Sequence, residues 1–153
     1  MTTKQLQYNT LAMNQLDTQD AALLAKAREA LDHAYAPYSK FQVGAAVLLD
    51  NGEVVTGSNQ ENAAYPSGLC AERVALFYAQ HKYPQAKVKA LAIAAKNDGE
   101  ELVEPVMPCG ACVQVMSETV KRYGQSFRVL LGAKDHVIAL DDAMDFIPFR
   151  FEL

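Results

Sequence analysis

The chain has 153 residues, of which 50% are apolar and 21% are charged, and its net charge is -4. This length and balance predict a single globular domain and argue against a disordered or membrane protein, because no apolar run approaches the roughly 20 residues of a membrane span. A nucleic-acid polymer is a poor partner, since the sequence has no basic run that could bind a polyphosphate backbone. A small neutral substrate is compatible with this charge.

The N-terminus reads MTTKQLQYNTLAMNQ and lacks the basic-then-apolar order of an export signal. Three cysteines cannot all pair within one chain, which favours a reducing compartment. Both observations predict a cytoplasmic protein. Residues 1–16 are polar and weakly periodic, and we expect them to form an N-terminal arm of unknown role before a single domain at residues 17–153.

Apolar residues at three-and-four spacing between Leu24 and Ala34 predict a first helix, which Asp17 or Thr18 caps and Pro37 ends. The other predicted elements follow in chain order: strands at 41–49 and 53–59 joined by a turn at 50–52, a helix from 70 to about 81, a strand at 89–95, a loop at 97–108, a helix from 109 to about 123, and strands at 127–133 and 137–140.

Helices that alternate with apolar strands require a sheet that is covered on both faces. The predicted fold class is therefore α/β, a three-layer α/β/α sandwich with about five strands in its central sheet. The strand order does not follow from this pattern.

The three cysteines of the chain lie in two short stretches, each at the predicted start of a helix. Cys70 begins one helix, and Cys109 and Cys112 begin another with the two-residue gap that lets two thiolates bind one metal ion. The unpaired N–H groups and partial positive charge of a helix start favour thiolates. Three thiolates favour a borderline cation, so we predict one Zn²⁺ per chain held by Cys70, Cys109 and Cys112.

A structural zinc site normally has four protein ligands, and this chain has no fourth cysteine. The histidines are at positions 33, 81 and 136, and none has a spacing that ties it to the cluster. Three protein ligands leave one position for water, which is the arrangement of catalytic zinc sites. Glu72 lies two residues after Cys70 and could serve as the proton carrier, although an isolated glutamate in a first turn would more simply complement the helix dipole.

Two motifs, Cys70-Ala71-Glu72 and the PCGAC at 108–112, resemble those of the zinc nucleoside and nucleobase deaminases. More narrowly, the chain from Tyr35 to its C-terminus resembles the small homotetrameric cytidine deaminases. The segments that carry this resemblance are YSKFQVGAAV, NQENAAYPSGLCAER and IPFRF.

The resemblance implies a mixed central sheet and a hydrolase of pyrimidine salvage. A zinc-bound hydroxide would attack C4 of cytidine or deoxycytidine, with Glu72 as the proton shuttle, and ammonia would leave to give uridine or deoxyuridine. It also implies a homotetramer with shared active sites.

The resemblance assigns further roles by position. Phe41 would flank the nucleoside, although it is alternatively an ordinary core residue of a strand. Asn59 and Glu61 would bind the ribose, and the backbone at Ala71 would orient the pyrimidine. Phe151 would reach a neighbouring subunit's site. Two more assignments complete this set: Arg73 would donate hydrogen bonds to the ligand thiolates, and Tyr65 would lie near a subunit interface.

Val113 departs from the family pattern, which has arginine directly after the second cysteine of PCGAC. The chain therefore keeps only Arg73 to soften the negative charge of three thiolates around Zn²⁺. Two alternatives stay open: a deaminase of a modified cytidine or nucleoside antibiotic, and a non-catalytic zinc-binding module.

Overall fold

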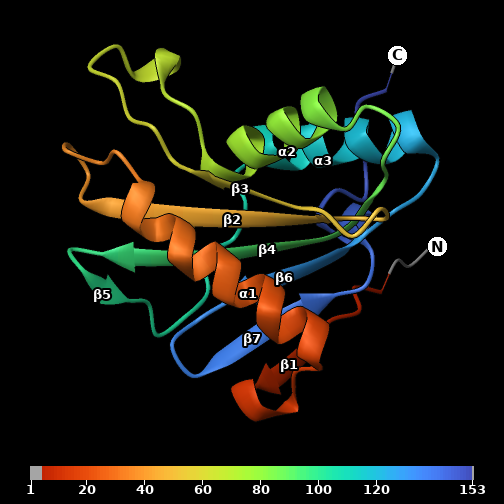
Figure 1. Cartoon of the computed structure of the whole chain (residues 1–153), viewed down its shortest axis with the longest axis horizontal. Helices are drawn as coiled ribbons and strands as arrows, with labels where there is room; N and C mark the ends of the chain where they lie inside the picture. The colour runs from red at the N-terminus through yellow and green to blue at the C-terminus, as the bar shows by residue number, and fades with distance from the viewer. Residues whose placement is uncertain (1–4, 153) are drawn as a thin grey trace.

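A seven-stranded mixed sheet forms the centre of the protein (Figure 1). The computed structural model describes residues 5–152. Six strands follow the order β1-β7-β6-β4-β2-β3, with β5 paired to β4. Only β4 and β6 pair in parallel, and the other neighbours are antiparallel. The strands are β1 (Asn9–Ala12), β2 (Phe41–Leu49), β3 (Val54–Ser58), β4 (Val88–Asn97), β5 (Glu100–Glu101), β6 (Arg128–Gly132) and β7 (His136–Leu140).

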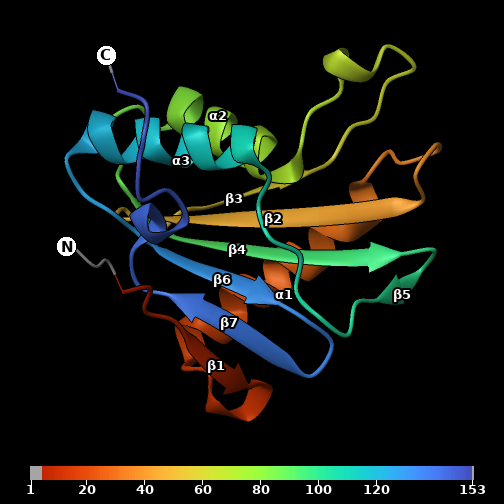
Figure 2. The same cartoon turned by 180° about the vertical axis from the view of Figure 1, so that it is seen from behind.

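Helices cover the sheet on both sides. Helix α1 (Thr18–Ala30) crosses one face, and α2 (Ala71–Lys82) and α3 (Gly110–Tyr123) lie side by side on the other (Figures 1 and 2). Alternate residues of β2 and β4 belong to two separate apolar clusters, one beneath each layer of helices. This alternation is the signature of a sheet buried on both faces, and it confirms the predicted three-layer α/β/α fold.

The first helix begins as predicted and ends earlier than predicted. The Asp17 side chain caps it by accepting the N–H of Asp20, at 2.8 Å. The helix ends at Ala30, because a 3₁₀ turn at Leu31–His33 follows it. The chain is then extended, and Tyr35, two residues before Pro37, forms a β-bridge with Gln60.

Two glycines let helices approach the sheet closely. A Cβ atom on Gly44 in β2 would lie 2.1 Å from the Ala27 carbonyl oxygen of α1. A Cβ atom on Gly57 in β3 would lie 2.6 Å from the Ala75 nitrogen of α2. The first contact lets α1 lie close on β2, and the second lets α2, the helix that follows Cys70, lie directly on β3.

The structure adds two short strands to the five that were predicted. In the predicted loop at 97–108, Asp98 and Gly99 both have positive φ and form a tight turn, so that β5 folds back on β4. The loop prediction was therefore wrong at Asn97, the last residue of β4, and at the two residues of β5, because the Asp98–Gly99 turn reverses the chain and lets it pair with itself.

In the predicted arm, β1 pairs with β7 at the edge of the sheet, and Leu11, Met13 and Leu16 pack against the cluster beneath α1. The arm is therefore attached to the sheet edge over residues 9–16, while the division of the chain at Asp17 stays a prediction. Residues 1–4 and 153 lie outside the described residues. Within residues 5–152, no helix has both the length and the apolar character needed to cross a membrane.

Candidate metal and substrate site

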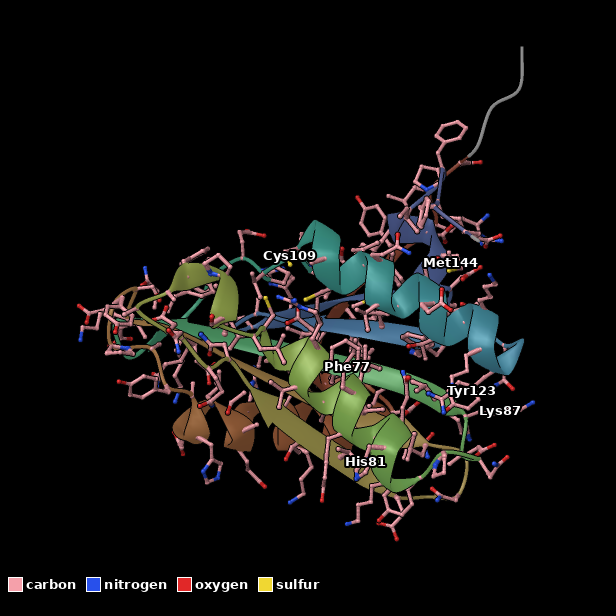
Figure 3. All side chains as sticks on the ribbon, turned by 90° about the horizontal axis from the view of Figure 1, so that it is seen from above. Phe77, His81, Lys87, Cys109, Tyr123 and Met144 are labelled. Atoms are coloured by element: carbon pink, nitrogen blue, oxygen red, sulfur yellow. The ribbon has the colours of Figure 1, made fainter. Side chains whose placement is uncertain are left out.

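The starts of α2 and α3 meet and bring the three cysteines together. Cys70 and Cys109 are the residues that precede the two helices, both with extended backbone, and Cys112 lies in the first turn of α3. Figure 3 shows Cys109 at the start of α3, next to the start of α2. Cys112 is fully buried and Cys109 is exposed, so the cluster lies at the edge of the core with one side open.

The sulfur atoms are spaced as zinc requires. The Sγ atoms of Cys70 and Cys109 are 3.8 Å apart, those of Cys109 and Cys112 are 3.5 Å apart, and all three lie within 4.8 Å of one another. A tetrahedral zinc with Zn–S bonds of about 2.3 Å places its sulfurs about 3.8 Å apart. In residues 5–152, no histidine or carboxylate oxygen joins this group. The cluster fits one zinc ion with three protein ligands.

Arg73 is the cation beside the cluster. Its Nη2 donates to the Sγ of Cys70 at 3.3 Å, whereas its Nε is buried without a hydrogen-bond partner. The pKa of the Cys70 thiol is lowered to about 5, first by the hydrogen bond with Cys112 and then by the hydrogen bonds with Arg73 and Cys109. The site therefore favours a thiolate at Cys70.

Glu72 is a buried acid in the first turn of α2, with only 5% of its surface exposed. Burial is the main cause that raises the pKa of its carboxyl above the ordinary value, and the negative charge of Cys70 adds to this. Glu72 is not a member of the sulfur cluster. Burial thus makes the protonated form easier to reach than in an exposed glutamate, which suits a proton carrier.

A cavity of about 780 Å³ opens onto the cluster. Its walls include Cys70, Cys109 and Arg73 together with Asn59 and Glu61. Such a volume lies within the range of small-molecule sites, roughly 300–1,000 Å³. One cavity therefore joins the metal ligands to the residues expected to bind ribose.

The Asn59 side chain bonds to the start of β2. Its Oδ1 accepts the N–H of Val43 and its Nδ2 donates to the carbonyl of Phe41, both at 2.8 Å. These two bonds leave one N–H of the Asn59 amide for another partner.

The Glu61 carboxylate is held by the loop before β2. Its Oε2 accepts the N–H groups of Tyr38 and Ser39, and its Oε1 accepts the hydroxyl of Ser39. These hydrogen bonds lower the pKa of Glu61, and the bond from the Ser39 hydroxyl contributes most. Tyr38 and Ser39 also line the cavity. Neither residue had a role predicted from the sequence, although both lie in the YSKFQVGAAV segment that resembles the deaminases.

Of the other predicted site residues, one lines the cavity and the rest do not. Phe41 is half-buried at the start of β2 and is not among the residues that line the cavity, and Ala71 is fully buried at the start of α2. Tyr65 lines the cavity and is highly exposed. Phe151 is 66% exposed, and its carbonyl accepts a hydrogen bond from Gln114 of α3. Phe151 is not among the residues that line the cavity.

Val113 is buried in α3 directly after Cys112, with 7% exposure. A charged side chain at this position would therefore be largely removed from water. His33 and His81 are exposed, and His136 lies on β7, where its Nε2 is 3.8 Å from Glu104. None of the three histidines belongs to the sulfur cluster.

Similarity to known proteins agrees with this geometry. The family model "Cytidine and deoxycytidylate deaminase zinc-binding region" matches residues 17–123, which include all three cysteines. A cytidine deaminase of Halalkalibacterium halodurans is 49% identical over 96 residues, which cover 63% of this chain and 68% of that protein. A cytidine deaminase of Mycobacterium tuberculosis is 47% identical over 131 residues, 86% of this chain and 88% of that protein.

Among solved structures, the cytidine deaminase of Burkholderia pseudomallei resembles the chain with a TM-score of 0.72 and 35% identity, covering 89% of this chain and 100% of that one. The zinc cofactor that was predicted from the cysteines thus agrees with both the sulfur geometry and the zinc-binding region of the family model. The chain belongs to the cytidine and deoxycytidylate deaminase family.

Proposed function

We propose that this chain is a zinc-dependent hydrolase that converts cytidine and deoxycytidine to uridine and deoxyuridine, with release of ammonia. The observation that carries this proposal is the open cluster of three sulfurs with a buried glutamate two residues after one of its members. The names of the relatives from H. halodurans and M. tuberculosis support the same reaction.

Cys70, Cys109 and Cys112 would hold the zinc ion. Zinc, when bound, supplies a water that is acidic enough to act as a nucleophile near neutral pH. Arg73 supports the thiolate form of Cys70 through its hydrogen bond to the sulfur. The absence of a fourth protein ligand within residues 5–152 disfavours a closed structural zinc site.

Glu72 would carry the protons of the reaction. Its carboxylate accepts a proton from the nucleophile and delivers it to N3 of the pyrimidine, and a second transfer goes to the departing amine. The net reaction adds one water and releases one ammonia. Burial raises the pKa of Glu72 and so makes its protonated form easier to reach than in an exposed glutamate, which favours this exchange.

The cavity favours a nucleoside over a nucleotide. Asn59 has a free N–H and Glu61 is an acceptor, so together they can bind the hydroxyls of a neutral sugar. Arg73 is the one cation among the lining residues, and it is engaged by Cys70. A 5′-phosphate would therefore meet the Glu61 carboxylate without a free cation to bind it. Phe41 flanking the base and the Ala71 backbone orienting it complete the proposed substrate contacts.

We also propose a homotetramer in which Phe151 contributes to a neighbouring site. The exposed aromatic rings of Phe149 and Phe151 in the C-terminal tail support this arrangement, because apolar rings at a surface favour burial against a partner. Light scattering of the full chain and of a chain that lacks residues 149–153 tests it. A fully active monomer would contradict it. The cytosolic location also stays a prediction, which the free cysteines support.

The deciding experiment combines metal analysis with an ultraviolet assay of substrate loss. Purified protein should contain one zinc per chain and should deaminate cytidine and deoxycytidine but not cytidine 5′-monophosphate. A panel that includes modified cytidines tests the alternative substrates to which Val113 points. Zinc-loaded, folded protein that is inactive on every member of the panel would contradict the enzymatic proposal and favour a binding module.

A further inference from the structure

The metal site depends on the distance between two helices. One ligand precedes α2, and the other two belong to the start of α3. Neither helix carries a complete set, so the three sulfurs meet only if α2 and α3 keep a fixed separation. Figure 3 shows the two helices side by side, both running away from the region of Cys109.

A hydrogen-bonded pair joins the same two helices further along. The Nε2 of Gln80 on α2 donates to the Oγ1 of Thr119 on α3 at 2.7 Å. Each residue lies ten positions after the cysteine that precedes its helix, Cys70 or Cys109, which corresponds to about 15 Å along each axis at 1.5 Å per residue. The pair therefore joins the helices at equal heights above the sulfur cluster.

The pair is part of a fully bonded polar group. Thr119 is only 3% exposed, and its hydroxyl donates to the carbonyl of Val115 at 2.8 Å, which leaves its oxygen free to accept from Gln80. The Oε1 of Gln80 accepts from Nη1 of Arg122 at 3.1 Å, so the amide is held in one orientation. A buried hydroxyl with a directed partner fixes geometry more strictly than apolar contact does, because loss of the bond leaves a polar atom unpaired.

We propose that Gln80 and Thr119 are positioning residues for the metal site. Their hydrogen bond sets the spacing of α2 and α3 and so holds Cys70 at binding distance from Cys109 and Cys112. The inference rests on the proposed zinc site. It differs from an ordinary helix contact in one respect: its loss should weaken metal binding in the folded protein, and not only lower the stability of the fold.

The test measures zinc affinity by competition with a chelator of known affinity, well below the melting temperature of each variant. Thr119→Val removes the hydroxyl while keeping the shape of the side chain, and it should weaken zinc binding about fivefold, equivalent to ~1 kcal/mol. Thr119→Ser keeps the hydroxyl and should restore the wild-type affinity. Gln80→Leu removes the other partner and should act like Thr119→Val, which keeps the test available if the valine variant fails to fold.

A matched control separates positioning from stability. Val137→Ala creates a cavity in the cluster beneath α1, on the far side of the sheet, and should lower the melting temperature without changing zinc affinity. If Thr119→Val lowers the melting temperature but keeps zinc affinity within twofold of wild type, the positioning role is refuted while the zinc site stands. If the wild-type protein binds no zinc, both the positioning role and the proposed function fail.

Discussion

Replacement of Glu72 by glutamine should separate activity from stability. The amide keeps the shape of the side chain but cannot accept and return protons. A general acid–base group typically contributes 10²–10⁴-fold to the rate, which corresponds to about 2.7–5.4 kcal/mol of transition-state stabilisation. Glu72 would serve more than one transfer, so we expect kcat to fall by at least about 100-fold while the zinc content stays at one per chain.

The same substitution should not destabilise the fold near neutral pH. The pKa of Glu72 is raised above its ordinary value of 4.5, chiefly by burial. Such a group contributes stability that is fully present below the ordinary pKa and is lost as the pH rises through the folded-state pKa. The raised pKa therefore makes the stability of the fold fall as the pH rises above the ordinary value, and glutamine, which does not titrate, removes this loss. We expect Glu72→Gln to melt at or above the wild-type temperature at pH 7.5, with the difference shrinking as the pH falls.

The assay requires zinc-matched samples, a nucleoside activity measurement and thermal melts followed by circular dichroism. Glu118→Gln is the matched control, because it makes the same chemical change at an exposed position of α3 and should alter neither activity nor stability. Retention of more than about a tenth of the wild-type kcat would show that Glu72 is not the proton carrier. A melting temperature several degrees below wild type at pH 7.5 would refute the stability argument.

Three further substitutions test other parts of the structure. Asn59→Ala removes two hydrogen bonds to the main chain at the start of β2, so KM should rise and the fold should lose roughly 1–3 kcal/mol per unpaired group. Steady-state kinetics measures the first effect and thermal unfolding the second, and an unchanged melting temperature would contradict the structural role. Gly57→Ala places a Cβ 2.6 Å from the backbone of α2, and a strain of about 1–3 kcal/mol should lower both the melting temperature and zinc retention. Gly110→Ala should change neither, because its Cβ would meet no atom within 4 Å apart from its chain neighbours and its own helix. Val113→Arg buries a guanidinium at a position with 7% exposure and should cost several kcal/mol, measured by circular dichroism. If that variant folds and binds zinc, the acidic limb of its kcat/KM–pH profile should move to lower pH, and an unmoved limb would show that Val113 does not tune the metal.

The layers and the cysteine cluster could be predicted because their signals are local. The run FQVGAAVLL, followed by a DNG turn, predicts a buried strand, and it forms β2 at Phe41–Leu49 as expected. The cysteines were expected at two helix starts, and Cys70 and Cys109 directly precede α2 and α3. Apolar runs, turn residues and motif spacing determine these features without knowledge of distant partners.

Features that depend on distant partners could not be predicted. Asn9–Ala12 has no strong strand pattern and becomes β1 because the open edge of β7 offers it hydrogen bonds. Nothing near Gln80 or Thr119 in the sequence indicates that they bond to each other, since 39 residues separate them. The hydrogen bond from the Ser39 hydroxyl to Glu61 also joins residues that are far apart in the sequence. Such pairings follow from strand order and helix placement, which a single sequence does not specify.

The sulfur ligands are divided between neighbours in the chain and a distant partner. Cys109 and Cys112 are three residues apart, whereas Cys70 precedes Cys109 by 39 residues. Strand β4 lies between β2 and β6 in the sheet, and its parallel partner β6 follows α3 in the chain, so this pairing is non-local. Non-local pairings generally form slowly, and Cys70 can meet the other two cysteines only once α2 and α3 have packed on the sheet. In an unfolded chain, Cys109 and Cys112 are therefore the two thiolates close enough in sequence to bind a metal ion first. We expect complete three-thiolate coordination to be a late event of folding, so that thiolate-to-metal absorption in a cobalt-loaded chain would report completion of the sheet and not the first capture of the ion.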